Sequence, residues 1–306
     1  MFFVVVILCA VVIRAQQDVA FAHYWAMEPS FNPASVGKEM KLNVAAAYAM
    51  QLAGFENNPK TMYAAADLPF YVLGSYHGAG IQLINDDIGL FSHKRLGLQY
   101  ALKKAFLGGT LSAGVQFTLL SESFKGSKVD VIDTDDPVFG KADITGTGID
   151  FGAGLYYQHR QWYVGVSALH VNSPHVEMGE KNELDISVTY YLTGGYNIQL
   201  RNPFLSIHTS ALGRTDGVAW RADITGRLKY THEKKVMYAG LSCSPTNSVT
   251  VMIGGNFHGI HLGYSYEVYT SALSIGNGSH ELFVGYQSEL NLVKKGRNLH
   301  KSVRIL

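Results

Sequence analysis

The hydrophobic pattern of this chain alternates with a period of two residues, most clearly near the C-terminal end. From Ile260 to Val268, apolar residues occupy every even position, and polar or small residues occupy the odd ones. After a connection rich in Gly, Asn and Ser, the pattern resumes at Leu282, Val284 and Tyr286. Such alternation is the period of a β-strand with one apolar and one polar face. The two runs predict an antiparallel pair whose apolar side chains share one face.

Similar runs fill the chain from Met40 onwards. They cover residues 41–53, 60–70, 78–85, 90–106, 110–121, 148–159, 161–171, 186–200, 204–214, 217–231, 235–243 and 248–258, before the closing pair. Tight turn signals such as Leu107-Gly108-Gly109 alternate with longer polar connections. We therefore expect an all-β fold, a transmembrane antiparallel barrel of about fourteen strands of about ten residues each.

Charged residues on the polar faces indicate what the barrel encloses. They alternate with apolar residues in the runs 90–106 and 217–231, and six of them are expected to face the lumen: Arg95, Lys103, Arg221, Asp223, Arg227 and Lys229. A dry sandwich core would make unpaired charges costly, whereas a polar lumen tolerates them. They either select a passing solute or neutralise one another in an internal network, and the neighbouring opposite charges favour the network.

Composition agrees with a barrel in the outer membrane. Charged residues make up only 16% of the chain, and it contains 32 Gly and 18 Tyr. An apolar outer face with aromatic girdles has this composition, although a secreted β-sandwich would share it. The net charge of +1 gives no reason to expect nucleic acid as a partner.

The N-terminal end predicts export and a separate segment ahead of the barrel. Residues 1–15 are an apolar run of signal-peptide length, and removing it with Cys9 would leave Cys243 without a disulfide partner. Residues 16–39 lack alternation and contain several aromatic residues and two prolines. We expect them to plug the lumen or seal the periplasmic end of a barrel formed by residues 40–306. No later stretch is long and apolar enough for a transmembrane helix.

Candidate chemistry is sparse. An acidic cluster within 124–147 does not follow calcium-loop spacing, and we expect an extracellular loop there. His258 and His261 have metal-like spacing, but they flank a turn at Gly259 and no further ligands accompany them. We expect no enzyme activity, no metal and no cofactor.

Both ends of the mature chain resemble the PorP/SprF family. The N-terminal resemblance rests on Gln17, Asp18, Phe21, Tyr24, Trp25, Asn32, Pro33, Ala34 and Gly37. The C-terminal one rests on Gly263-Tyr264-Ser265-Tyr266, Ser271, Leu273, Ser274, Gly278-Ser279-His280-Glu281 and Gly285-Tyr286. One departure is Tyr266-Glu267, where the family commonly has Tyr-Asp.

The resemblance implies an outer-membrane component of the type IX secretion system of Bacteroidetes, which is not an enzyme. It implies periplasmic ring components and a peptidoglycan-binding protein as partners. The client would be a secreted surface protein with a C-terminal sorting domain, such as a gliding adhesin. Partner contacts would fall on the motif residues Tyr24, Trp25, Asn32, Pro33, Ala34, Gly37, Tyr264, Tyr266, His280 and Glu281.

A FadL-like uptake channel for hydrophobic molecules is the alternative, since that family also combines fourteen strands with an N-terminal hatch containing Asn-Pro-Ala. Its members are usually much longer, with a large hatch and apolar extracellular loops. Here residues 16–39 are the whole N-terminal segment, and the loops are polar. The secretion hypothesis therefore takes precedence.

Overall fold

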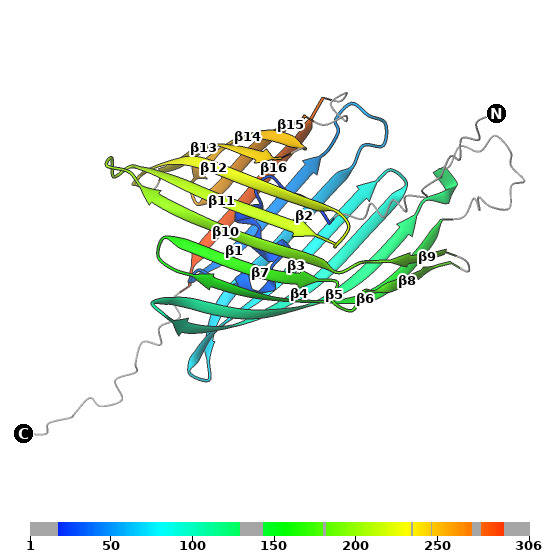
Figure 1. The fold of residues 1–306 in the computed structure, drawn as a ribbon, viewed down its shortest axis with the longest axis horizontal. Coiled ribbons are helices and arrows are strands. Elements are labelled where there is room, and N and C mark those ends of the chain that lie inside the picture. The colour runs from blue at the N-terminus through cyan, green and yellow to red at the C-terminus, as the bar shows by residue number, and fades with distance from the viewer. Residues whose placement is uncertain are drawn as a thin grey trace, which may run out of the picture.

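The fold is a closed barrel of fourteen antiparallel strands in the described part of the chain, as the alternation predicted (Figure 1). The computed structural model describes residues 18–128, 143–179, 182–233, 235–245, 247–270 and 277–290. The barrel closes where the first strand pairs with the last, from Lys41 opposite Glu289 to Met50 opposite His280. Closure leaves no free sheet edge around the ring, which excludes a two-sheet sandwich.

The strand boundaries follow the alternating runs to within a few residues at most ends. The barrel strands are β1 (Lys41–Met50), β2 (Lys60–Val72), β3 (Ser75–Ile88), β4 (Phe91–Phe106), β5 (Gly109–Phe124), β6 (Ile144–Gln158), β7 (Trp162–Leu169), β10 (Thr189–Gln199), β11 (Leu205–Thr215), β12 (Trp220–His232), β13 (Lys235–Ser244), β14 (Ser248–Phe257), β15 (Ile260–Tyr269) and β16 (Ser279–Glu289). Strand β3 continues past the predicted end at residue 85 through Asp86 and Asp87, where both faces are polar and alternation gives no signal.

The prediction of a polar loop between the runs 161–171 and 186–200 is wrong in part. The chain there forms a two-stranded hairpin of β8 (His175–Met178) and β9 (Asn182–Asp185). Val176 and Met178 are buried against Leu120 of β5. Two apolar residues in a four-residue strand are too few for alternation to be recognised. Of the acidic cluster, residues 130, 133, 135 and 136 lie outside the described residues.

The outer face of the barrel is apolar. Leu98, Val115, Leu192 and Ile253 are each more than half exposed in the isolated chain, and they point away from the lumen. A contiguous exposed apolar surface of this kind requires a non-aqueous environment, which a bilayer supplies.

The connections define the orientation of the barrel. At the end that holds Lys41 and Glu289, adjacent strands are joined by five residues or fewer, whereas the longest connections, 51–59, 125–143, 170–188 and 270–278, are at the other end. In bacterial barrels the short turns are periplasmic and the long loops extracellular. Residues 41 and 289 therefore lie at the periplasmic end.

Candidate functional site

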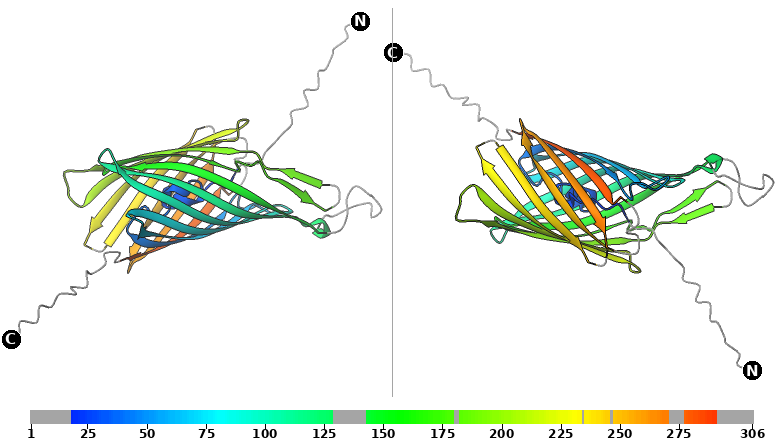
Figure 2. Two further views of the ribbon diagram at one scale, coloured as in Figure 1. Left: turned by 90° about the horizontal axis from the view of Figure 1, so that it is seen from below. Right: turned by 90° about the horizontal axis from the view of Figure 1, so that it is seen from above.

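The lumen contains the chain's own N-terminal residues 18–40, called the lumen segment from here on. In both views of Figure 2 the dark-blue segment is enclosed by the strands. It is built from three short 3₁₀ helices, η1 (Tyr24–Ala26), η2 (Glu28–Ser30) and η3 (Pro33–Ser35). It begins beside residues at the extracellular ends of β4, β10 and β11 and ends at Lys41 on the periplasmic side. The segment thus passes through the lumen from end to end.

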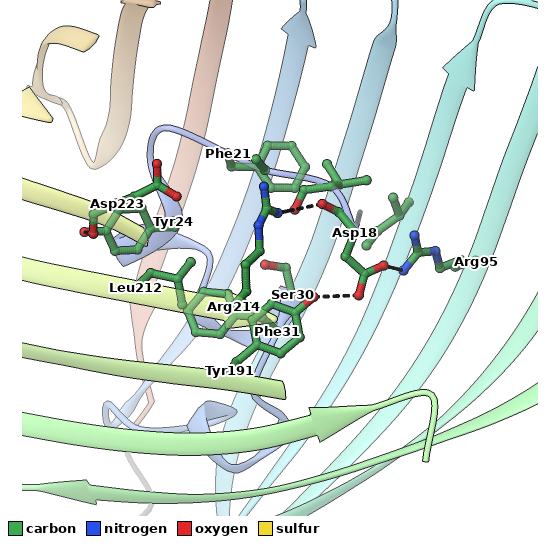
Figure 3. Close-up of a pocket in the computed structure, with 13 residues that line it drawn as sticks. Asp18, Phe21, Tyr24, Ser30, Phe31, Arg95, Tyr191, Leu212, Arg214 and Asp223 are labelled. Carbon is green, nitrogen blue, oxygen red and sulfur yellow. Dashed lines mark hydrogen bonds and ion pairs between the residues drawn. The ribbon is translucent and has the colours of Figure 1, made fainter. Parts of the chain in front are cut away.

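Asp18 anchors the extracellular end of the lumen segment (Figure 3). Its carboxylate lies 2.6 Å from the Arg95 guanidinium, accepts a hydrogen bond of 2.5 Å from the Tyr191 hydroxyl and lies 3.2 Å from His170 Nε2. Arg214 donates to the carbonyl oxygen of Asp18 at 2.6 Å. Burial alone would raise the pKa of Asp18, but Arg95 and His170 hold that pKa well below its usual value. The buried carboxylate is therefore charged and paired.

His170 gives this anchor a pH dependence. Burial opposes its charge, but Asp18 and Asp150 raise the His170 pKa to about 9. A raised pKa means that the stabilisation is complete below the unfolded value of about 6.5 and is lost as pH rises through about 9. We expect the thermal midpoint of the wild type to fall more between pH 8 and pH 10 than that of His170→Gln. Equal slopes for the two proteins would contradict the assignment, since other titrating groups are common to both.

Glu281 of β16 anchors the next part of the lumen segment. Its carboxylate accepts hydrogen bonds from the backbone N–H groups of Ala22 and His23 at 2.7 and 3.0 Å, and it lies 2.6 Å from His23 Nδ1. The His23 ring stacks on Phe283 with 5.6 Å between centroids. A motif residue near the C-terminal end thus fixes a residue near the N-terminal end.

The two aromatic motif residues contact strands β11 and β12. The Tyr24 hydroxyl donates to Ser210 Oγ at 3.1 Å and to the Asp223 carbonyl oxygen at 3.3 Å. The Arg227 guanidinium carbon lies 3.5 Å from the centroid of the Trp25 ring, a cation–π geometry. Two of the six predicted lumen charges, Arg227 and Arg95, therefore hold the lumen segment.

The Asn-Pro-Ala motif forms a tight turn against glycines of the wall. Asn32 Oδ1 accepts from the Ala34 N–H at 2.9 Å and caps η3, and Pro33 takes the first helical position. A Cβ atom on Gly114 of β5 would overlap the backbone of Pro33 and Ala34, and one on Gly154 of β6 would overlap the Asn32 amide. Only residues without a side chain allow the turn to approach the wall this closely.

The periplasmic end of the lumen segment is fixed by a glycine and an ion pair. Gly37 has φ of +61°, and its N–H donates to Asp67 Oδ2 at 2.6 Å. A residue with a Cβ would be strained at this φ. Lys38 Nζ lies 2.6 Å from Glu28 Oε2, which joins the last residues of the segment back to η2.

The C-terminal motif residues divide between two faces of the barrel. Glu281 points into the lumen, whereas Tyr264, Tyr266 and His280 lie together on the outer face. The Tyr264 hydroxyl is 2.7 Å from His280 Nδ1, and the Tyr266 ring centroid is 5.0 Å from that of His280. Their side chains bond to one another and to the Asn277 carbonyl oxygen.

The remaining predicted lumen charges form a partial network. Arg221 pairs with Asp223 at 3.0 Å and with Glu267 at 3.1 Å. Lys103 and Lys229 make no ion pair within the described ranges. The sequence did not identify His170, Tyr191 and Arg214 as partners of Asp18, because they lie more than a hundred residues away and no local motif marks them.

Two small cavities border the lumen segment. One cavity beside Asp18 and Phe21 and another beside Ala22 and Glu281 each have a volume of about 20 Å³. That volume holds about one water molecule. Among the residues that the structure describes, no cluster of His, Cys, Asp and Glu is arranged to hold a metal, and no helix is long and apolar enough to cross a membrane.

A closed fourteen-stranded antiparallel barrel with an apolar outer face defines a bacterial outer-membrane β-barrel protein. Residues 13–286 match the family described as "Type IX secretion system membrane protein PorP/SprF", and the chain belongs to that family. It is thus an outer-membrane protein of the family associated with type IX secretion.

The chain is similar to several solved structures at low sequence identity. The CymD monoaromatic hydrocarbon channel is 10% identical over 87% of this chain and 93% of that chain, with a TM-score of 0.53. The toluene transporter TodX of P. putida is 11% identical over 85% and 92%, with a TM-score of 0.47. BamA from Haemophilus ducreyi, lacking POTRA domains 1–3, is 9% identical over 81% and 70%, with a TM-score of 0.44. No curated protein matches the chain.

Proposed function

We propose that this protein is a closed, non-enzymatic component of the type IX secretion machinery that supports export or surface attachment of proteins with C-terminal sorting domains. The observation that supports the proposal is the occupied lumen, where the lumen segment is anchored by Asp18 at one end and by Gly37 at the other. A lumen filled in this way has no room for a folded client. The barrel would then act through protein partners at its two ends.

The two ends offer different surfaces to such partners. The short periplasmic turns would meet the ring components and a peptidoglycan-binding protein. On the extracellular side, β3–β6 and the β8–β9 hairpin extend beyond the rest of the barrel (Figures 1 and 2). The hairpin carries exposed polar groups, including His175, whose Nδ1 lies 2.6 Å from Asp185. This extension is the surface that we assign to the secreted client.

Uptake of hydrophobic molecules is the second candidate. The likeness to the hydrocarbon channel CymD supports it only at the level of the fold. An uptake channel needs a continuous path from loops to periplasm, whereas the cavities beside the lumen segment hold about one water each. Uptake would require the segment to move.

A comparison of exported proteins tests the proposal. The culture medium and cell surface of a strain lacking the gene would be compared quantitatively with the same strain carrying the gene on a plasmid. We expect one or more proteins with C-terminal sorting domains to be lost from the surface, to accumulate inside the cell and to return on complementation. An unchanged exported set would overturn the secretion role and make solute uptake the function to test next.

A further inference from the structure

The outer wall of the barrel carries a groove that the lumen segment does not touch. It crosses β2 to β6 and has a volume of about 770 Å³. Its side chains include Met62, Leu83, Leu119 and Ile149, each about half exposed in the isolated chain and pointing away from the lumen. We call this concave surface the outer groove. Its volume lies within the range of about 300–1,000 Å³ that is typical of small-molecule sites.

The outward-facing residues change from apolar to polar at the outer groove, inside it on β3 to β6 and just beyond its edge on β2. Going toward the extracellular end, the change runs from Met62 to Lys60 on β2, Leu83 to Asn85 on β3, Leu96 to Lys94 on β4, Leu119 to Ser121 on β5 and Ile149 to Thr147 on β6. The strand register places the steps on β3 to β6 side by side, since Leu96 pairs with both Leu83 and Leu119, and Leu119 pairs with Ile149. The step on β2 lies one pair farther toward the extracellular end, with Met62 opposite Asn85. A common apolar-to-polar step marks the boundary between the hydrocarbon core and the headgroups.

The polar half of the outer groove contains one outward-facing charge, that of Lys94. Lys94 is exposed in its centre and has no ion-pair partner within the part of the chain that the structure describes. Lys60 on β2 and the ion pair of Lys125 with Asp87, at 4.0 Å, lie farther toward the extracellular end, beyond the residues that line the groove. The exposed Lys94 ammonium therefore offers a cation to an anionic group at headgroup depth.

We propose that the outer groove binds one lipid with an anionic, phosphate-bearing headgroup. Its acyl chains lie along Leu83, Leu119 and Ile149, and its phosphate lies against the Lys94 ammonium. A concave apolar surface below a cation at the interface matches the two parts of such a lipid, whereas a zwitterionic headgroup would gain less from Lys94. The outer groove lies on the outer wall of the barrel, so lipid binding there does not depend on the role in secretion.

Retention of lipid by the purified protein tests the site. The full chain would be taken from vesicles of equal phosphatidylglycerol and phosphatidylcholine into mild detergent, and bound lipid counted by native mass spectrometry. The wild type is expected to retain one phosphatidylglycerol in preference to phosphatidylcholine. Lys94→Glu is expected to lower that retention roughly tenfold. The matched control is Lys104→Glu, an exposed lysine on the same face of β4 near its periplasmic end, which should retain the lipid like the wild type.

A second variant tests the apolar half. Leu83→Trp fills part of the outer groove without changing its charge, and it is expected to lower the retention of both lipids. Folding of each variant is checked by its heat-dependent mobility in gel electrophoresis, and Lys94→Gln replaces Lys94→Glu if the latter does not fold. Equal retention by the Lys94 and Lys104 variants, equal retention of the two lipids by the wild type, or undiminished retention by Leu83→Trp would each overturn the proposal.

Discussion

Deleting residues 18–38 converts the closed barrel into an ion-conducting pore, which is the largest functional effect that we expect from any change in this chain. The deletion removes the groups that contact Asp67, Glu281 and Arg214 and leaves these polar side chains facing an empty lumen. Water enters a polar lumen of this kind. Barrels of about 16 to 18 strands already enclose an aqueous channel, and fourteen strands come close to that size.

Planar-bilayer recordings measure this effect. The wild type is expected to show no stepwise conductance, and the deleted variant to show steady open steps at the same protein concentration. Gly226→Leu serves as the folded control, because nothing lies within 4 Å of a Cβ atom added at Gly226. A deleted variant that folds and stays closed would show that the lumen segment is not what closes the barrel. Conductance by the wild type would instead favour solute uptake as the function.

The sequence predicted the barrel well because one physical rule governs all of its strands. A strand between lipid and a polar lumen must alternate, so runs such as 260–268 are readable without any knowledge of their partners. Alternation gives no signal where both faces of a strand are polar or where a strand contains too few apolar residues. Strand β3 extends through Asp86 and Asp87 above the apolar belt, and β8 buries only Val176 and Met178.

The site was less predictable, because its contacts join residues that are far apart in the chain. The sequence marked Asn32, Pro33 and Trp25 as unusual, since prolines and aromatic residues interrupt a chain that otherwise alternates. It gave no reason to connect Asp18 with Arg214 or His23 with Glu281, which are separated by more than 190 residues. Local alternation shows which side chains of a strand face the lumen. Their contact partners in the lumen depend on how the whole barrel closes.

The role of the glycines in the barrel wall could not be predicted from the sequence either, because it depends on which part of the chain each glycine faces. Gly114 in β5 looks like a weak point of the strand, yet it is the place where the Asn-Pro-Ala turn touches the barrel. Gly226 in β12 has no such neighbour. The same residue type is therefore required at one position and replaceable at the other, which a pair of identical substitutions can show.

Gly114→Leu is accordingly expected to destabilise the protein by about 1–3 kcal/mol or more through overpacking against Pro33 and Ala34. Gly226→Leu, on the open side of its strand, is expected to be neutral or slightly stabilising, because it adds an apolar side chain to the lipid face. Urea unfolding in vesicles measures both. Combined with the deletion of residues 18–38, the Gly114 substitution should lose its cost, since the groups it clashes with are gone. If Gly114→Leu still destabilises the deleted variant, the overlap would lie within the barrel wall, which would contradict the close contact assigned to the Asn-Pro-Ala turn.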